Sequence, residues 1–230
     1  MMNTTEINMM GMLRAGVHFG HQKARRHPKM KPYVYAVRNN LSIIDLKQSL
    51  KGLEEARGFV GKIASQGGVI LFVGTKKQTK GIVKEVAEKC EMPYVAERWL
   101  GGTLTNFKVI LNRIEKLVEM EKEKESGEWE KKYTKKEQLE FRKDIKRMEL
   151  KFGGVKNLRK LPEAIFVADP KENETAIREA KEVGIPVIAV ADTDVNPEDI
   201  NYPIPSNDDA IKAIEMMVSS IGEAVMESKK

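Results

Sequence analysis

The sequence predicts a doubly wound α/β fold, in which helices cover both faces of a mostly parallel sheet. Three continuous apolar runs, rich in β-branched residues, support this prediction, because strands buried on both faces lack the alternating pattern of half-exposed strands. A helical pattern follows each of the first two runs, as β-α-β units require. The runs span residues 68–73, 164–168 and 186–190.

The other elements are predicted around these strands. Residues 33–37 and 41–44 flank Arg38-Asn39-Asn40 and predict a β-hairpin whose turn presents Arg38 to solvent. Asp45 can cap a helix over residues 46–63, although three glycines weaken the helical pattern there. Further predicted elements are helices over 76–90, 171–183 and 208–226 and a short strand over 94–96.

The α/β rhythm breaks at a charged insertion over residues 105–152, which divides the predicted α/β domain into residues 1–104 and 153–230. Apolar residues recur in the insertion at spacings of three and four, which predicts two helices with narrow apolar seams, an antiparallel coiled-coil hairpin. Ser126-Gly127 marks the predicted bend, and Thr134 and Glu137 fit a capping box for the second helix. Fourteen Lys or Arg against eleven Asp or Glu indicate a solvated arm, with docking of RNA or protein as the alternative.

The composition favours a cytoplasmic protein. Cys90 is the sole cysteine, so the chain cannot form an internal disulfide and suits a reducing compartment. No apolar run approaches the roughly 20 residues that a membrane-spanning helix needs.

The segment from Arg14 to Arg38 contains no Asp or Glu, whereas a solvated protein surface usually mixes the two charges. Aromatic rings and three histidines lie between its cations, a composition typical of a surface that follows the phosphates of a nucleic acid. The predicted phosphate contacts are Arg14, Lys23, Arg25, Arg26, Lys29, Lys31 and Arg38, with His18, Phe19, His21, Tyr33 and Tyr35 as contacting or stacking neighbours.

Charge is distributed unevenly along the whole chain. Residues 1–50 hold eight Lys or Arg and two Asp or Glu, while residues 161–210 hold three and twelve. We therefore expect a basic face that lies against nucleic acid and an acidic face that points to solvent or to basic partners.

Two glycine-containing loops are secondary candidates for RNA contact. Gly74-Thr75-Lys76-Lys77 opens a helix after a buried strand, where doubly wound proteins hold phosphates, so a phosphate-handling enzyme is the rival hypothesis. The turn lacks the glycine patterns of nucleotide sites, and no nucleotide cofactor is predicted. In the second loop Arg98 and Trp99 are predicted to contact RNA, with packing of Trp99 in the core as the alternative.

Neither a metal nor a catalytic residue is predicted. His18, His21 and His27 have no carboxylate or cysteine in their own segment, so a metal would need ligands from far along the chain, such as Asp192 or Asp194. An α/β hydrolase could use the acids that follow the last buried strand, but no nucleophile motif accompanies them, and turns and helix caps are the favoured explanation.

Five segments carry a combined signal: Ala15–His21, Asn40–Leu46, Leu71–Lys77, Arg98–Phe107 and Ile185–Asp209. Together they resemble the bacterial ribosomal protein S2 family. The likeness extends from about residue 8 to about residue 226, and the combination of His18–His21 with Arg98–Phe107 is highly specific. The chain departs from the family pattern at Asp194, where Asn is frequent, and it ends without a long acidic tail.

The resemblance implies a flavodoxin-like or Rossmann-like domain with a protruding coiled coil, placed on the solvent side of the small ribosomal subunit between its head and body. It implies a structural protein without catalytic activity that binds small-subunit ribosomal RNA and contacts neighbouring ribosomal proteins. Support for docking of the messenger-binding protein S1 is a further implication, which the short C-terminal tail leaves open.

Overall fold

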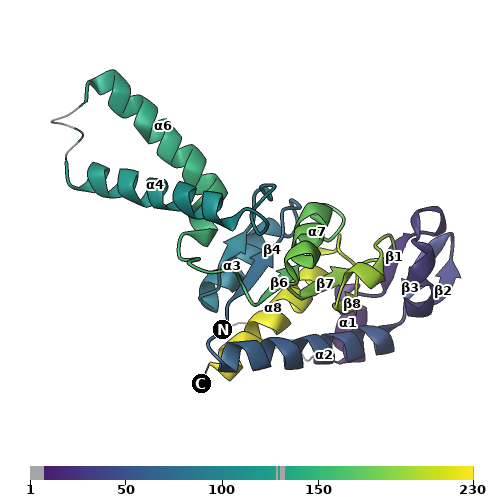
Figure 1. Cartoon of the computed structure of the whole chain (residues 1–230). Helices are drawn as coiled ribbons and strands as arrows, with labels where there is room; N and C mark the ends of the chain where they lie inside the picture. The colour runs from purple at the N-terminus through teal and green to yellow at the C-terminus, as the bar shows by residue number, and fades with distance from the viewer. Residues whose placement is uncertain (1–7, 128, 130–132, 230) are drawn as a thin grey trace.

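A computed structural model describes residues 8–127, 129 and 133–229 of the chain. In these residues the chain forms a five-stranded sheet, a three-stranded sheet and a two-helix arm. Figure 1 shows the arm and the small sheet at opposite ends of the central sheet.

The five-stranded sheet is entirely parallel and confirms the predicted fold class. Its strand order is β5-β4-β6-β7-β8, which is the flavodoxin-like order 2-1-3-4-5. The strand β8 was not predicted, and it contains Pro203 and Pro205, which an edge strand accommodates because one side needs no ladder of N–H groups. The strands are β4 (Ile70–Val73), β5 (Tyr94–Val95), β6 (Ala164–Val167), β7 (Val187–Ala191) and β8 (Tyr202–Pro205).

Side chains of the central strands alternate between two apolar cores, one on each face of the sheet. Ile70 and Phe72 of β4 pack in the core that contains α2, α3 and α8, while Leu71 and Val73 pack in the core that contains α7 and the base of the arm. Both faces are thus covered, which is why the strand sequences are continuously apolar. The helices are α2 (Leu46–Ser65), α3 (Lys80–Lys89), α7 (Glu174–Val183) and α8 (Ile211–Ser228).

A close crossing of α2 over β8 explains the glycine inside that helix. A Cβ on Gly52 would lie 2.5 Å from the carbonyl oxygen of Pro203, whereas a Cβ on Gly58 would meet no atom within 4 Å. We expect Gly52→Ala to lower the free energy of unfolding by about 2 kcal/mol, because the helix must move away from backbone. Gly58→Ala should raise it by about 0.5–1 kcal/mol, since Ala is the better helix former. Urea unfolding measures both, and equal stability of the two variants would contradict this explanation.

The N-terminal segment forms a small antiparallel sheet with the order β1-β3-β2. The predicted hairpin is confirmed, and Asn39 and Asn40 adopt φ values of 47° and 62°, as a type I′ turn requires. A short helix, one strand and two 3₁₀ helices of this segment were not predicted. The elements are α1 (Met9–Ala15), β1 (Phe19–Gln22), η1 (Lys23–Arg25), η2 (Pro28–Tyr33), β2 (Val34–Arg38) and β3 (Leu41–Ile44).

Two helices form the arm, α4 (Phe107–Glu125) and α6 (Lys135–Phe152), and α6 begins with the predicted capping box of Thr134 and Glu137. Buried residues such as Ile114 and Ile145 lie along the arm, whereas the helices diverge toward the tip (Figure 1). The two helices are confirmed, and their winding as a coiled coil stays a prediction. Part of the predicted connection, residues 128 and 130–132, lies outside the described residues. Two short 3₁₀ helices, η3 (Gly153–Val155) and η4 (Pro197–Asp199), complete the fold.

Candidate nucleic-acid interface

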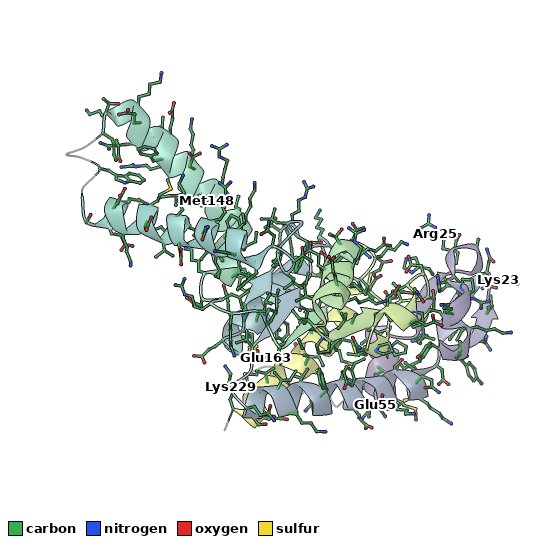
Figure 2. All side chains as sticks on the ribbon, viewed as in Figure 1. Lys23, Arg25, Glu55, Met148, Glu163 and Lys229 are labelled. Carbon is green, nitrogen blue, oxygen red and sulfur yellow. The ribbon has the colours of Figure 1, made fainter. Side chains whose placement is uncertain are left out.

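Six of the seven cations predicted to contact phosphate gather on the small sheet and its 3₁₀ turns, and Arg14 lies on the preceding helix α1. We call the seven cations the basic strip. Six of the side chains are exposed and that of Arg26 is half-buried. Figure 2 shows Lys23 and Arg25 at the end of the molecule opposite the arm. The basic strip consists of Arg14, Lys23, Arg25, Arg26, Lys29, Lys31 and Arg38.

Most cations of the basic strip have no acidic partner in the described part of the chain. Lys29 forms an ion pair with Glu198, but the other six cations form none among the residues that the structure describes. Their positive field is therefore not cancelled by contacts within the protein. Such a surface attracts a polyanion and can exchange its counterions for phosphates.

The rings beside the basic strip differ in their accessibility. Tyr35 is 78% exposed and Phe19 is 45% exposed, so both can stack on a base or a sugar. Tyr33 is half-buried and packs against the core. His18 packs against Phe19 with a centroid distance of 4.0 Å and the two rings tilted by 39°. Its burial lowers its pKa and so favours the neutral ring.

His21 anchors β1 to the main sheet. Its Nδ1 lies 3.1 Å from Asp192 Oδ1, and its Nε2 lies 3.5 Å from Asp209 Oδ2. The contact with Asp192 outweighs the effect of burial and raises the pKa of His21 to about 9. The backbone N–H of His21 also donates to Thr193 Oγ1 at 2.8 Å. The structure thus gives His21 an anchoring position beneath the basic strip.

The turn after β4 is filled by a carboxylate of the protein itself. Asp169 follows β6 and accepts hydrogen bonds from the N–H groups of Thr75 at 2.9 Å and Lys76 at 2.6 Å. Burial outweighs these donors and raises the pKa of Asp169 to about 6. A phosphate bound where the strand order reverses would need the same N–H groups. The feature that favoured a phosphate-handling enzyme is therefore explained by internal structure.

The two lysines of this turn have different surroundings. Lys76 is half-buried, and its Nζ lies 3.2 Å from Asp208 Oδ1 and 2.6 Å from Asp209 Oδ1. Lys77 is exposed. Lys76 thus pairs internally with Asp208 and Asp209, and its contact with RNA stays a prediction, while Lys77 is open to a ligand.

The loop after β5 is wrapped around the buried carboxylate of Glu179. This side chain accepts hydrogen bonds from Trp99 Nε1 at 3.1 Å, from the N–H of Gly102 at 2.8 Å and from the N–H of Leu104 at 2.9 Å. Trp99 is only 8% exposed and its ring packs in the core, which favours the packing alternative over contact with RNA. Arg98 beside it is exposed.

Sequence reasoning missed both buried carboxylates. Glu179 lies on α7 between Ile177 and Ala180, in the buried stripe of that helix. An acid in an otherwise apolar stripe is the sequence feature that could have revealed a buried carboxylate. Asp169 comes directly after a buried strand, which is the position where a parallel sheet presents side chains to its ligand edge. Neither position identifies the N–H groups that these carboxylates bind.

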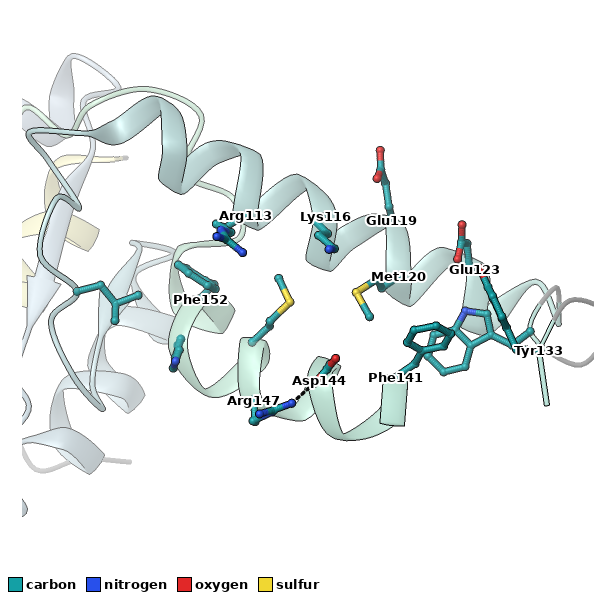
Figure 3. A pocket seen from close by; sticks show the side chains of 14 residues that line it. Arg113, Lys116, Glu119, Met120, Glu123, Tyr133, Phe141, Asp144, Arg147 and Phe152 are labelled. Carbon is teal, nitrogen blue, oxygen red and sulfur yellow. Dashed lines mark hydrogen bonds and ion pairs between the residues drawn. The ribbon is translucent and has the colours of Figure 1, made fainter. Parts of the chain in front are cut away.

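A cavity between the two arm helices is a second candidate surface. Figure 3 shows Met120 and Phe141 facing each other across it, with the ion pair of Arg147 and Asp144 on α6 beside them. Arg113 and Lys116 line the α4 side. The mixed charges of this lining contrast with the purely cationic basic strip.

The comparison with protein families agrees with the geometry. Among the described residues, no helix is long and apolar enough to cross a membrane. The model of the family described as Ribosomal protein S2 matches residues 12–228, which is nearly the whole chain. The chain therefore belongs to the ribosomal protein S2 family, whose members are structural proteins of the small ribosomal subunit.

Proposed function

We propose that the basic strip binds small-subunit ribosomal RNA through its phosphates, and that Phe19 and Tyr35 stack on exposed bases or sugars. The observation that carries this proposal is the group of exposed cations on α1, the small sheet and its 3₁₀ turns that form no ion pair with any described residue. Folded RNA is recognised mainly by shape and by phosphate and 2′-hydroxyl contacts, which suits a surface of this kind. Lys77 and Arg98 are secondary contacts, because both are exposed.

We place the protein between the head and the body of the subunit, on its solvent side, as the family resemblance implies. In this position the basic strip faces RNA, and the acidic segment 161–210 is left for solvent or for basic neighbouring proteins. We assign the arm, residues 105–152, to contacts with proteins, the messenger-binding protein S1 among them, because its charges are mixed and its cavity is partly apolar. Protein cross-links from the arm in assembled subunits test this assignment.

Salt dependence tests the proposed mode of binding. We expect the affinity for a small-subunit RNA fragment to fall by roughly 10³-fold between 50 and 200 mM salt, because binding through six or more phosphates releases as many counterions. Filter binding or fluorescence anisotropy at four salt concentrations gives the slope. An affinity that is independent of salt would rule out the phosphate mechanism.

A further inference from the structure

His21 from β1 meets carboxylates that follow two neighbouring strands of the main sheet. The carboxyl ends of parallel strands share one edge, so Asp192 and Asp194 after β7 lie near Asp208 and Asp209 after β8. One nitrogen of His21 and one oxygen each of Asp192 and Asp194 lie within 4.8 Å of one another. These are the distant ligands that the sequence alone could not bring together.

Two polar atoms in this group of three have no hydrogen-bond partner. The Nδ1 atom of His21 and the Oδ1 atom of Asp194 are both buried, and neither makes a hydrogen bond. The Nδ1 atom lies 3.1 Å from Asp192 Oδ1, but the contact lacks the alignment of a hydrogen bond. Buried polar atoms are rarely left unsatisfied in proteins. The Nδ1 atom of His21 is already paired with Asp192, so it is Asp194 Oδ1 that indicates a missing partner.

Of the four carboxylates around His21, Asp194 is the one without a cationic partner among the described residues. Lys76 neutralises Asp208 and Asp209, at 3.2 and 2.6 Å. Asp192 is only 1% exposed, but it pairs with His21 and accepts hydrogen bonds from the N–H and hydroxyl of Thr193 and from the N–H of Asp208. Asp194, in contrast, has no Lys or Arg partner in the described part of the chain. A buried carboxylate is stable only when a cation or several donors compensate its lost hydration.

We propose that His21, Asp192 and Asp194 bind a divalent cation of the Zn²⁺ type, with water in the fourth position. One imidazole and two carboxylates match the ligands that Zn²⁺ accepts, whereas Mg²⁺ requires an octahedron of oxygens. Bond lengths of about 2.0–2.2 Å in a tetrahedron place neighbouring ligand atoms about 3.3–3.6 Å apart, close to the observed 3.1 Å. A surface cavity lined by His21, Gln22 and Asp192 gives the ion access from solvent.

The ion would attach β1, and with it the small sheet, to the loop after β7. Thr193 already holds this contact, since its Oγ1 accepts from the N–H of His21 and its carbonyl accepts from the N–H of His27 at 2.8 Å. The consequence that the ion orients the basic strip toward RNA rests on the proposed function. The proposal that the ion binds does not depend on it.

Metal binding by the untagged full-length chain tests the proposal. After treatment with a chelator and gel filtration, the wild type should retain one equivalent of added Zn²⁺, measured by elemental analysis. A hundredfold excess over the dissociation constant should raise its Tm by roughly 5–10 °C. Millimolar Mg²⁺ should give no comparable shift. No uptake of Zn²⁺, or equal stabilisation by Mg²⁺, would overturn the proposal.

Two matched substitutions locate the site. Asp194→Asn should leave the metal-free Tm nearly unchanged, because Asp194 Oδ1 makes no hydrogen bond, and should weaken Zn²⁺ binding at least tenfold. Asp199→Asn is the control, since Asp199 lies nearby in the chain and pairs with Lys181 outside the site. It should keep the full Zn²⁺ shift. Wild-type binding by the Asp194 variant would place the ion elsewhere and overturn the assignment.

Discussion

Replacing Glu179 by Ala is expected to lower the free energy of unfolding by about 3 kcal/mol, because several buried donors lose their acceptor at once. Glu179 is 5% exposed, and the residues that carry two of the donors, Leu104 and Trp99, are buried as well, so the donors are shielded from solvent. Donors along the loop from Trp99 to Thr105 converge on this one carboxylate. Urea unfolding of the variant measures the loss.

The pH dependence of Glu179→Gln isolates the role of the charge. Burial would raise the pKa of Glu179, but the donors of the loop outweigh it and hold the pKa below the ordinary value of 4.5. The charge therefore adds stability that is present above pH 4.5 and is lost as the pH falls through the lowered pKa. We expect Gln to destabilise by about 2 kcal/mol at pH 7 and by less in acid, where the wild type is protonated too.

An exposed acid on the same helix is the control for both variants. Glu182→Gln in α7 should change the free energy of unfolding by less than about 0.5 kcal/mol at every pH. If Glu179→Gln behaved like this control, the carboxylate would not be what holds the loop.

Reversing four cations of the basic strip should lower the affinity for ribosomal RNA by at least about 10³-fold at 0.1 M salt, because four attractive interactions with phosphates become repulsive. The variant carries Glu at Lys23, Arg25, Lys31 and Arg38, which are exposed and form no ion pair among the described residues. Lys29 is left unchanged, since Glu there would repel Glu198. The slope of log affinity against log salt should fall by about four, one for each phosphate that is no longer neutralised.

An equal charge change on the arm controls for net charge. The exposed arm residues Lys108, Lys116, Arg142 and Lys146 can all be changed to Glu, which alters the total charge by the same amount. This variant should bind RNA far better than the strip variant, because its cations are distant from the proposed interface. Equal loss of affinity in both variants would show that the overall charge, and not the basic strip, determines binding.

The sequence predicted the elements that a short, contiguous residue pattern identifies. The buried strands β4, β6 and β7 are continuous apolar runs, and Asn39-Asn40 encodes its hairpin turn directly, so both predictions are confirmed. β8 was missed because two of its four residues are prolines, which local patterns exclude from strands. α1 and β1 were missed because they are short, and their structure depends on packing against α2, α8 and β3.

Side-chain environments that join distant parts of the chain could not be predicted. The residue types of Trp99 and Lys76 and their places in glycine-containing loops suggested contact with RNA. Their partners within the protein, Glu179 and Asp208, lie 80 and 132 positions away along the chain. His21 likewise meets its acids only when β1 docks on the edge formed by β7 and β8. The basic strip was accessible to sequence reasoning because its signal, cations without acids, is local.

Ultraviolet cross-linking of the protein to RNA in small ribosomal subunits, followed by mass spectrometry of the nucleotide-bearing peptides, tests the central claim most directly. We predict that the cross-linked residues concentrate between Arg14 and Arg38 and include Phe19 and Tyr35, the exposed rings of the small sheet. Cross-links confined to residues 107–152, with none in the basic strip, would contradict the account.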